Sequence, residues 1–146
     1  MDWRLRARLL MKHYCRELNV DAPEIEFVKT KGRHLGSCQR LKGWVVTYNP
    51  DGSVKDKVRV NPKIYITERF DQLFKEDPEK ADRLLRFTVA HEVGHLKHWY
   101  WGPSHTAEEY ANEEAEKLTG IKREEHVINA FEMIPSKEGG KRRGSP

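Results

Sequence analysis

One pentapeptide restricts what this chain can be more than any other part of it. His91-Glu92-Val93-Gly94-His95 is an H-E-x-x-H segment within an apolar, helix-like stretch. On a helix, His91 and His95 are four residues apart and therefore project from the same face. Two imidazole nitrogens at that spacing suit one Zn²⁺ ion. Glu92 lies beside them, where it can take a proton from a water molecule that the metal activates.

The expected burial of this segment separates a metal site from a chance match. A shuffled chain of the same composition contains H-E-x-x-H in roughly 4% of cases, so the motif alone is only suggestive. Its apolar neighbours predict a buried helix; they are Phe87, Val89, Ala90, Val93 and Leu96. Two buried histidines and a glutamate need polar partners. A metal ion supplies them.

The whole chain has the size of one domain. Its 146 residues are 37% hydrophobic and 34% charged, which allows a modest core under a very polar surface. We expect a single domain over 1–135 and a disordered basic tail over 136–146, where four basic residues and one acidic residue supply +3 of the formal net charge of +4. A weak contact of this tail with nucleic acid is the alternative to a purely solvated tail.

Cysteine usage and hydropathy indicate where the protein works. Cys15 and Cys38 are the only cysteines, which is too few for a disulfide framework. The sequence contains no run of about 18 apolar residues and no apolar leader segment. We therefore expect a cytoplasmic protein that has no membrane contact.

Hydrophobic periodicity and turn residues predict an α+β domain. The expected elements are an N-terminal helix over 2–18, strands at 25–28, 44–48 and 57–61, a motif helix from Asp77-Pro78 to about Gly102-Pro103, a helix over 106–118 and a last helix over 122–134. Turns are expected at Lys31-Gly32, Gly36-Ser37 and Asn49-Pro50-Asp51-Gly52, and the last of these makes a hairpin of 44–48 and 57–61. The prediction is a minimal zincin-like domain with a small twisted sheet of about three strands, a central motif helix, a ligand helix and a C-terminal helix.

A catalytic zinc takes three protein ligands, so a third one is needed after His95. The candidates are His98, His105, Glu108, Glu109, Glu113 and Glu114. If the motif helix continues, His98 projects beyond the metal. A turn at Gly102-Pro103 would let the chain return to the metal, so His105 is the alternative third ligand. Glu108 is favoured as the third ligand. If Thr106 caps the next helix, the Glu109 side chain bonds back to the backbone N–H of Thr106, whereas the Glu108 side chain remains available to bind the metal.

The helix that contains Glu108 has a pattern that supports this choice. Glu108, Ala111, Ala115 and Leu118 form one stripe, which suits a helix packed tightly against the zinc helix. Asn112 follows Glu108 by one turn, where it can bond to a ligand histidine as a supporting residue.

The two helices together resemble a known family. Residues 86–96, Arg-Phe-Thr-Val-Ala-His-Glu-Val-Gly-His-Leu, and residues 108–118, Glu-Glu-Tyr-Ala-Asn-Glu-Glu-Ala-Glu-Lys-Leu, are similar to the paired motifs of the ImmA/IrrE zinc metallopeptidases. The resemblance covers 84–118 closely and implies His91, His95 and Glu108 as metal ligands and Glu92 as catalytic base. It departs from the family at Glu114, where Phe is common, and at Leu118-Thr119-Gly120. The order of strands before the motif also resembles that of SprT-type zincins, which use a third histidine as ligand. This resemblance supports His105 as the alternative third ligand.

The expected function is that of a zinc-dependent metalloendopeptidase. Its substrate would be an intracellular protein or peptide, such as a transcriptional regulator, which the resemblance suggests. Lys57–Asn61 is the expected edge strand for an extended substrate, and Tyr100, His98 and His105 are candidates to stabilise the oxyanion. Apart from Zn²⁺ no cofactor-binding residues are expected. The alternatives are a non-catalytic zinc-binding module that regulates or binds proteins, and a SprT-like protease associated with DNA.

Overall fold

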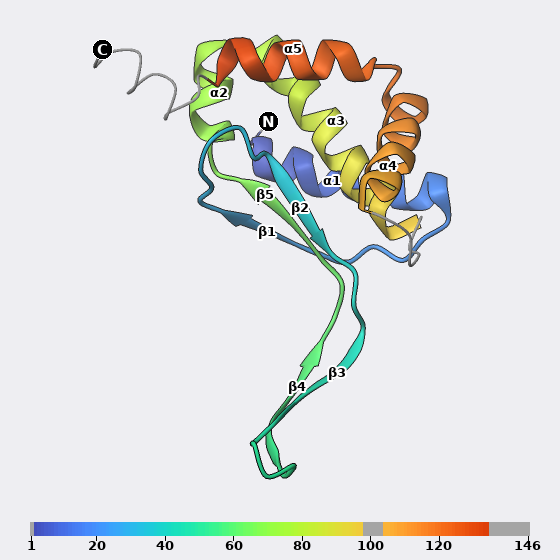
Figure 1. Ribbon diagram of the computed structural model, residues 1–146. Coiled ribbons are helices and arrows are strands. Elements are labelled where there is room, and N and C mark those ends of the chain that lie inside the picture. Colours follow the sequence, from blue (N-terminus) through green and yellow to red (C-terminus); the bar gives the residue numbers. More distant parts are fainter. Residues whose placement is uncertain (1, 98–103, 135–146) are drawn as a thin grey trace, which may run out of the picture.

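One long helix forms the centre of the fold, and most other elements pack against it (Figure 1). The computed structural model describes residues 2–97 and 104–134. The central helix, α3 (Pro78–Lys97), contacts α1 (Trp3–Leu18), α2 (Phe70–Glu76), α4 (Ser104–Thr119) and α5 (Arg123–Met133). Asp77 accepts a hydrogen bond from the backbone N–H of Lys80 at 3.2 Å, which confirms it as the cap that starts α3. The α+β class expected from the sequence is confirmed.

A three-stranded sheet packs against this helical layer. Its order is β1-β5-β2, with β1 (Glu24–Val28) parallel to β5 (Lys63–Thr67) and β2 (Gly36–Gln39) antiparallel to it. Of the three strands that the sequence predicts, only 25–28 belongs to this sheet. Both β5 and β2 were missed, and the turn predicted at Gly36-Ser37 is wrong because β2 begins there.

The predicted hairpin exists, but as a separate ribbon. Among the described strands β3 (Gly43–Tyr48) and β4 (Val54–Val60) pair only with each other, and Figure 1 shows them projecting from the body between β2 and β5. We call the ribbon 43–60 the arm. Since β2 and β5 pair directly, the arm is an extension inserted between two neighbouring strands.

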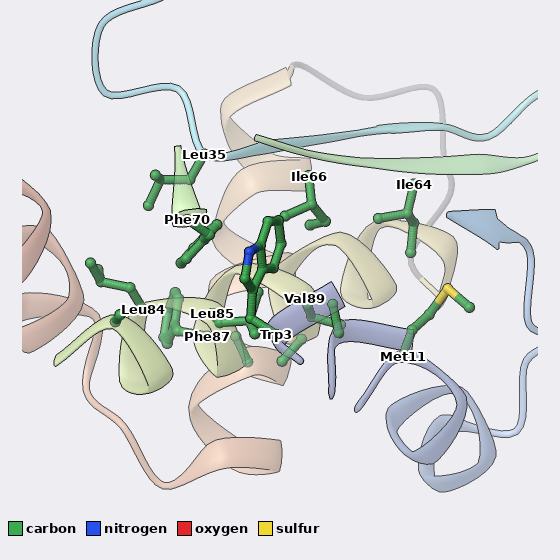
Figure 2. Close-up of a cluster of buried hydrophobic side chains, with 14 of the residues drawn as sticks. Trp3, Met11, Leu35, Ile64, Ile66, Phe70, Leu84, Leu85, Phe87 and Val89 are labelled. Atoms are coloured by element: carbon green, nitrogen blue, oxygen red, sulfur yellow. The ribbon is translucent and has the colours of Figure 1, made fainter. Parts of the chain in front are cut away.

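The core lies between the sheet and the helices (Figure 2). Ile64 and Ile66 of β5 meet Leu84, Leu85 and other side chains of α3, all of them fully buried. Burying each such side chain contributes about 1.5–3 kcal/mol. This core fixes α3 rigidly beside β2. Within the described residues no helix is both long and apolar enough to cross a membrane, and the tail predicted over 136–146 lies outside them.

Candidate metal centre and cleft

The second half of α3 places the motif residues at the boundary between the core and a cleft. Glu92 is only 4% exposed and His95 9%, whereas His91 is partly exposed. Val89, Ala90 and Val93 are fully buried around them. The burial expected from the apolar neighbours of the motif is therefore confirmed. It removes Glu92 from bulk water while leaving both imidazoles directed toward a neighbouring helix.

A glycine and an alanine set the distance between α3 and α4. A Cβ added to Gly94 would lie 2.9 Å from the Cα and 3.1 Å from the backbone oxygen of Ala111, so the two helices meet backbone against backbone. Ala107 and Ala115, one turn to either side of Ala111, are buried in the same contact. The tight helix pair expected from the Glu108, Ala111, Ala115 stripe is confirmed. It brings Glu108 to the motif.

The predicted start of this helix was wrong. It begins at Ser104, so Thr106 is a helical residue and not the cap that leaves Glu108 free. Glu108 nevertheless faces the motif, because its position on the stripe depends on spacing and not on where the helix begins.

Three side chains converge to form what we call the cluster. The Nε2 atom of His91 lies 3.1 Å from one carboxylate oxygen of Glu108, and Nε2 of His95 lies 2.6 Å from the other. One ligand atom from each residue fits within a span of 4.8 Å. Tetrahedral zinc with bonds of about 2.0–2.2 Å separates its ligands by roughly 3.3 Å, and the separations in the cluster, from 2.6 Å to at most 4.8 Å, lie on both sides of this value.

The electrostatics of the cluster favour a cation. Hydrogen bonding to His91 lowers the pKa of Glu108 to about 2, although partial burial opposes this shift. Desolvation lowers the pKa of His91, but its hydrogen bond to Glu108 and the charges of Glu92 and Glu108 outweigh that effect and leave the pKa raised. Desolvation also lowers the pKa of His95. The ionised Glu108 carboxylate thus favours a proton on His91, which a divalent cation binding to the same atoms would displace.

Glu92 differs from Glu108 in its environment. Burial raises the pKa of Glu92 to about 7, with the positive charge of His91 opposing and the negative charge of Glu108 adding to the shift. Two carboxylates in one site therefore have pKa values on opposite sides of the ordinary range. Such a difference is characteristic of sites where one group binds charge and the other exchanges protons.

Glu92 borders a cleft that consists of two adjoining halves. The polar half, about 350 Å³, lies beside the cluster and is lined by Ser37, Cys38 and Arg40 of the β2 segment. The apolar half, about 340 Å³, lies between α3, α5 and the segment before β2; it is lined by Leu35, Phe87, Val127, Ala130 and Phe131 among others. Gly36, His91 and Glu92 border both halves.

The side of the cleft opposite α3 is formed by β2. A Cβ on Gly36 would lie 2.9 Å from the Thr88 methyl group and 3.3 Å from the Glu92 carboxylate, so the absence of a side chain lets the strand approach the site. Among the described strands β2 pairs only with β5, which leaves its other edge free. Lys57–Asn61, the expected edge strand for a substrate, is largely exposed, but it lies mainly in the arm and lines neither half of the cleft.

The other predicted site residues have different outcomes. Asn112 borders the apolar half beside His91 and favours its protonated form, while Nδ1 of His91 is buried without a hydrogen-bond partner among the described residues. His105 is in the first turn of α4, but its side chain lies outside the described part of the structure, as do His98 and Tyr100 entirely. Glu108 is therefore the third candidate ligand that the described residues bring to the motif.

Sequence reasoning missed several polar residues that border the cleft, among them Arg40 and His126. Nη1 of Arg40 is buried and finds no partner among the described residues. His126 stacks on Phe87 with the ring centroids 4.3 Å apart, and burial lowers its pKa to about 4, which keeps it neutral. Neither residue belongs to a recognisable motif, and only the tertiary structure brings them to the cleft. Comparison with known proteins gives no match to a family model, to a curated protein or to a solved structure.

Proposed function

We propose that this protein is a zinc-dependent metallopeptidase that hydrolyses peptide bonds in protein substrates. The observation that carries the proposal is the convergence of His91, His95 and Glu108 on one small volume beside a buried glutamate, Glu92. Two imidazole Nε2 atoms and one carboxylate are a donor set that suits Zn²⁺ and that leaves a position for a non-protein ligand. A zinc ion bound there would polarise a carbonyl group and lower the pKa of a water molecule to about 7.

Glu92 acts as the general base in this proposal. It borders both halves of the cleft together with His91, and the charges of His91 and Glu108 both act on its carboxylate. It accepts a proton from the attacking water and passes it to the amine that leaves. Its burial excludes bulk water, which strengthens the electrostatic interactions within the site.

The free edge of β2 provides a place for an extended peptide. Backbone N–H and C=O groups on an unpaired edge can bond to a substrate strand, and β2 passes Glu92 at the closest approach that Gly36 permits. A peptide bound to this edge would present its bond between the polar and apolar halves of the cleft. Arg40, which lines the polar half, is our candidate donor to the carbonyl oxygen on that side.

The apolar half of the cleft supports a preference for a large apolar side chain next to the cleaved bond. At one side of this half the Arg33 guanidinium lies 3.8 Å from the centre of the Phe131 ring and donates a hydrogen bond from Nε to the Ile134 carbonyl at 2.7 Å, which joins the segment before β2 to α5. Val127 and Phe131 are 42% and 58% exposed, so this half is open to a ligand from outside.

Metal analysis and proteolysis of matched variants test the proposal. Purified wild type loaded with zinc should hold one ion per chain and cleave an unfolded protein such as casein. Glu92→Gln should keep the zinc and lose about 10²–10⁴-fold in cleavage rate, whereas Glu109→Gln, an exposed neighbour of Glu108 on α4, should change neither property.

Two further variants test the third ligand. Glu108→Ala should lose zinc and His105→Ala should retain it; the reverse result would transfer the ligand role to His105. If the wild type binds a full equivalent of zinc but cleaves no unfolded protein, the proposed peptidase function is wrong and a zinc-binding regulatory module is the better proposal.

A further inference from the structure

The arm is the most exposed part of the described structure. Every residue of β4 except Val60 is exposed, and large side chains stand in solvent, with Trp44 57% and Tyr48 63% exposed. The arm projects from the body and pairs with no strand of the main sheet (Figure 1). A two-stranded ribbon without a covered face is marginally stable in water. Exposed aromatic side chains on such a ribbon indicate that a ligand covers it.

The strand register sorts the side chains of the arm onto two different faces. Trp44 and Tyr48 are on the same face of β3, since alternate residues of a strand point the same way. Arg59 is the partner of Trp44 in the ladder and Lys57 lies two residues from it, so both share this face. The ammonium group of Lys57 lies 4.8 Å from the centre of the Trp44 ring, and the Arg59 guanidinium 5.9 Å.

The opposite face has a different chemistry. It presents Val45, Thr47 and Val58 together with Asp56. The acidic side chain of Asp56 is thus separated by the ribbon from the aromatic and basic face. Asp51, at the tip, is occupied by hydrogen bonds from the backbone N–H and the hydroxyl group of Ser53 at 2.9 and 2.6 Å. Neither acid neutralises the face that bears Trp44.

The arm and its base concentrate positive charge. Residues 40–63 include six basic and two acidic side chains, a net charge of +4 that equals the formal net charge of the whole chain. The basic tail was expected to be the main source of the surplus, but this segment contributes at least as much. Within the arm itself, residues 43–60 hold three basic and two acidic side chains, and two of the basic ones, Lys57 and Arg59, lie beside the exposed ring of Trp44.

We propose that the aromatic and basic face of the arm binds single-stranded nucleic acid. Trp44 and Tyr48 would stack on unpaired bases, and Lys57 and Arg59 would neutralise the adjacent phosphates, a combination typical of single-strand binding surfaces. A single strand fits better than a duplex, because paired bases hide the ring faces that these side chains need. The proposal does not depend on the peptidase activity, since no residue of this face borders the cleft.

Fluorescence anisotropy of the full chain with a labelled oligodeoxythymidylate of 20 nucleotides tests this proposal. The wild type should bind, with an affinity that falls linearly with salt on logarithmic axes. Trp44→Ala/Tyr48→Ala should weaken binding at least tenfold, and Trp44→Phe should retain most of it. Lys57→Gln/Arg59→Gln should reduce the salt slope by about 1.4, or about 0.7 for each phosphate that is no longer neutralised.

A charge-matched control uses Lys12→Gln/Arg16→Gln, two exposed positions on α1 that lie outside the arm. This variant should bind as the wild type does, because it retains the whole face. If the control variant weakens binding as much as the arm variants do, net charge alone explains the effect and the proposal is overturned. Equally tight binding of a 20-base-pair duplex would also overturn it. Unchanged binding in both arm variants would also overturn it. An unchanged melting temperature of the arm variants shows that the body is still folded.

Discussion

The contact between Gly94 and Ala111 makes a sharp test of the site, because it predicts the sign of a stability change. Gly94→Ala adds one methyl group within α3. At an open helical position this substitution stabilises a protein by roughly 0.5–1 kcal/mol, since alanine is the better helix former. Here the new Cβ would lie 2.9 Å from the Ala111 Cα and 3.1 Å from its backbone oxygen.

The size of the effect follows from how little these atoms can give way. Carbon atoms in good contact are about 3.5–4.0 Å apart, so α4 must retreat by roughly half an ångström or more. Overpacking of a close core contact costs about 1–3 kcal/mol, and the upper part of that range applies because the obstacle is backbone. After the gain in helix propensity, we expect a net loss of about 1–2 kcal/mol. The melting temperature would fall by roughly 3–6 °C for a chain of this size.

The same displacement should weaken metal binding. Glu108 is one turn before Ala111 on α4, so a retreat of that helix moves its carboxylate away from His91 and His95. Changes that disturb a ligand in this indirect way cost about 10–100-fold in metal affinity. We expect about tenfold, measured by competition with a chromogenic zinc chelator. Glu113→Ala, an exposed change on the same helix, should leave the affinity as it is.

Two results would refute this reasoning. A Gly94→Ala protein that melts at a higher temperature than the wild type would mean that the helices are not in backbone contact. Restoration of stability by a second change, Ala111→Gly, would mean that the obstacle is the side chain of Ala111. The structure instead has the new Cβ meeting backbone atoms of Ala111, so the double variant should be at least as unstable as Gly94→Ala alone.

Other outcomes follow from the cluster, the thiols and an ion pair. Removing metal with EDTA should lower the melting temperature, because zinc at 100 times its Kd contributes about 2.7 kcal/mol; a wild type that responds no more than Glu108→Ala would contradict the metal site. Burial raises the pKa of Cys15 to about 11 and that of Cys38 to about 12, so Ellman's reagent at pH 8 should label the native protein slowly and both thiols rapidly in urea. Rapid labelling of native protein would show that the core is more open than described. Hydrogen bonds from Trp3 and Arg4 lower the pKa of Asp71, so this carboxylate stabilises the fold above its unfolded pKa of about 3.9, and that stability is lost as the pH falls through the lower folded value. Asp71→Asn should therefore be less stable than wild type in urea melts at pH 7, and the difference should shrink below about pH 4.

Much of the site could be predicted because helical spacing determines it. His91 and His95 share a face whatever surrounds them, and Glu108 shares a stripe with Ala111 whether its helix begins at 104 or 106. The chemistry that they perform stays a prediction. The rest of the cleft could not be predicted in this way, since Arg40 and His126 reach it from β2 and α5, and no local pattern tells which distant elements will meet.

The sheet was harder to predict than the helices. The segment Lys63–Thr67 has β-branched and aromatic residues, but it directly follows the expected strand at 57–61 and Pro62, and no separate strand was expected there. Gly36–Gln39 has little intrinsic strand preference, and its pairing with β5 makes it a strand. The last helix was expected over 122–134, but its sequence does not tell that Val127, Ile128 and Phe131 are exposed and that two of them border the cleft.

The insertion of the arm between two paired strands has an evolutionary consequence. Gln39 lies opposite Lys63 in the ladder, so a tight turn at that point would join β2 to β5 directly. The arm is therefore a variation in loop length, and doubling the length of a loop costs only about 0.6 kcal/mol. Descendants of this chain can lose, lengthen or exchange the segment between residues 39 and 63 while the helices and the cleft persist. Differences in partner choice between such descendants should thus concentrate in this segment, while the cluster and the cleft are inherited.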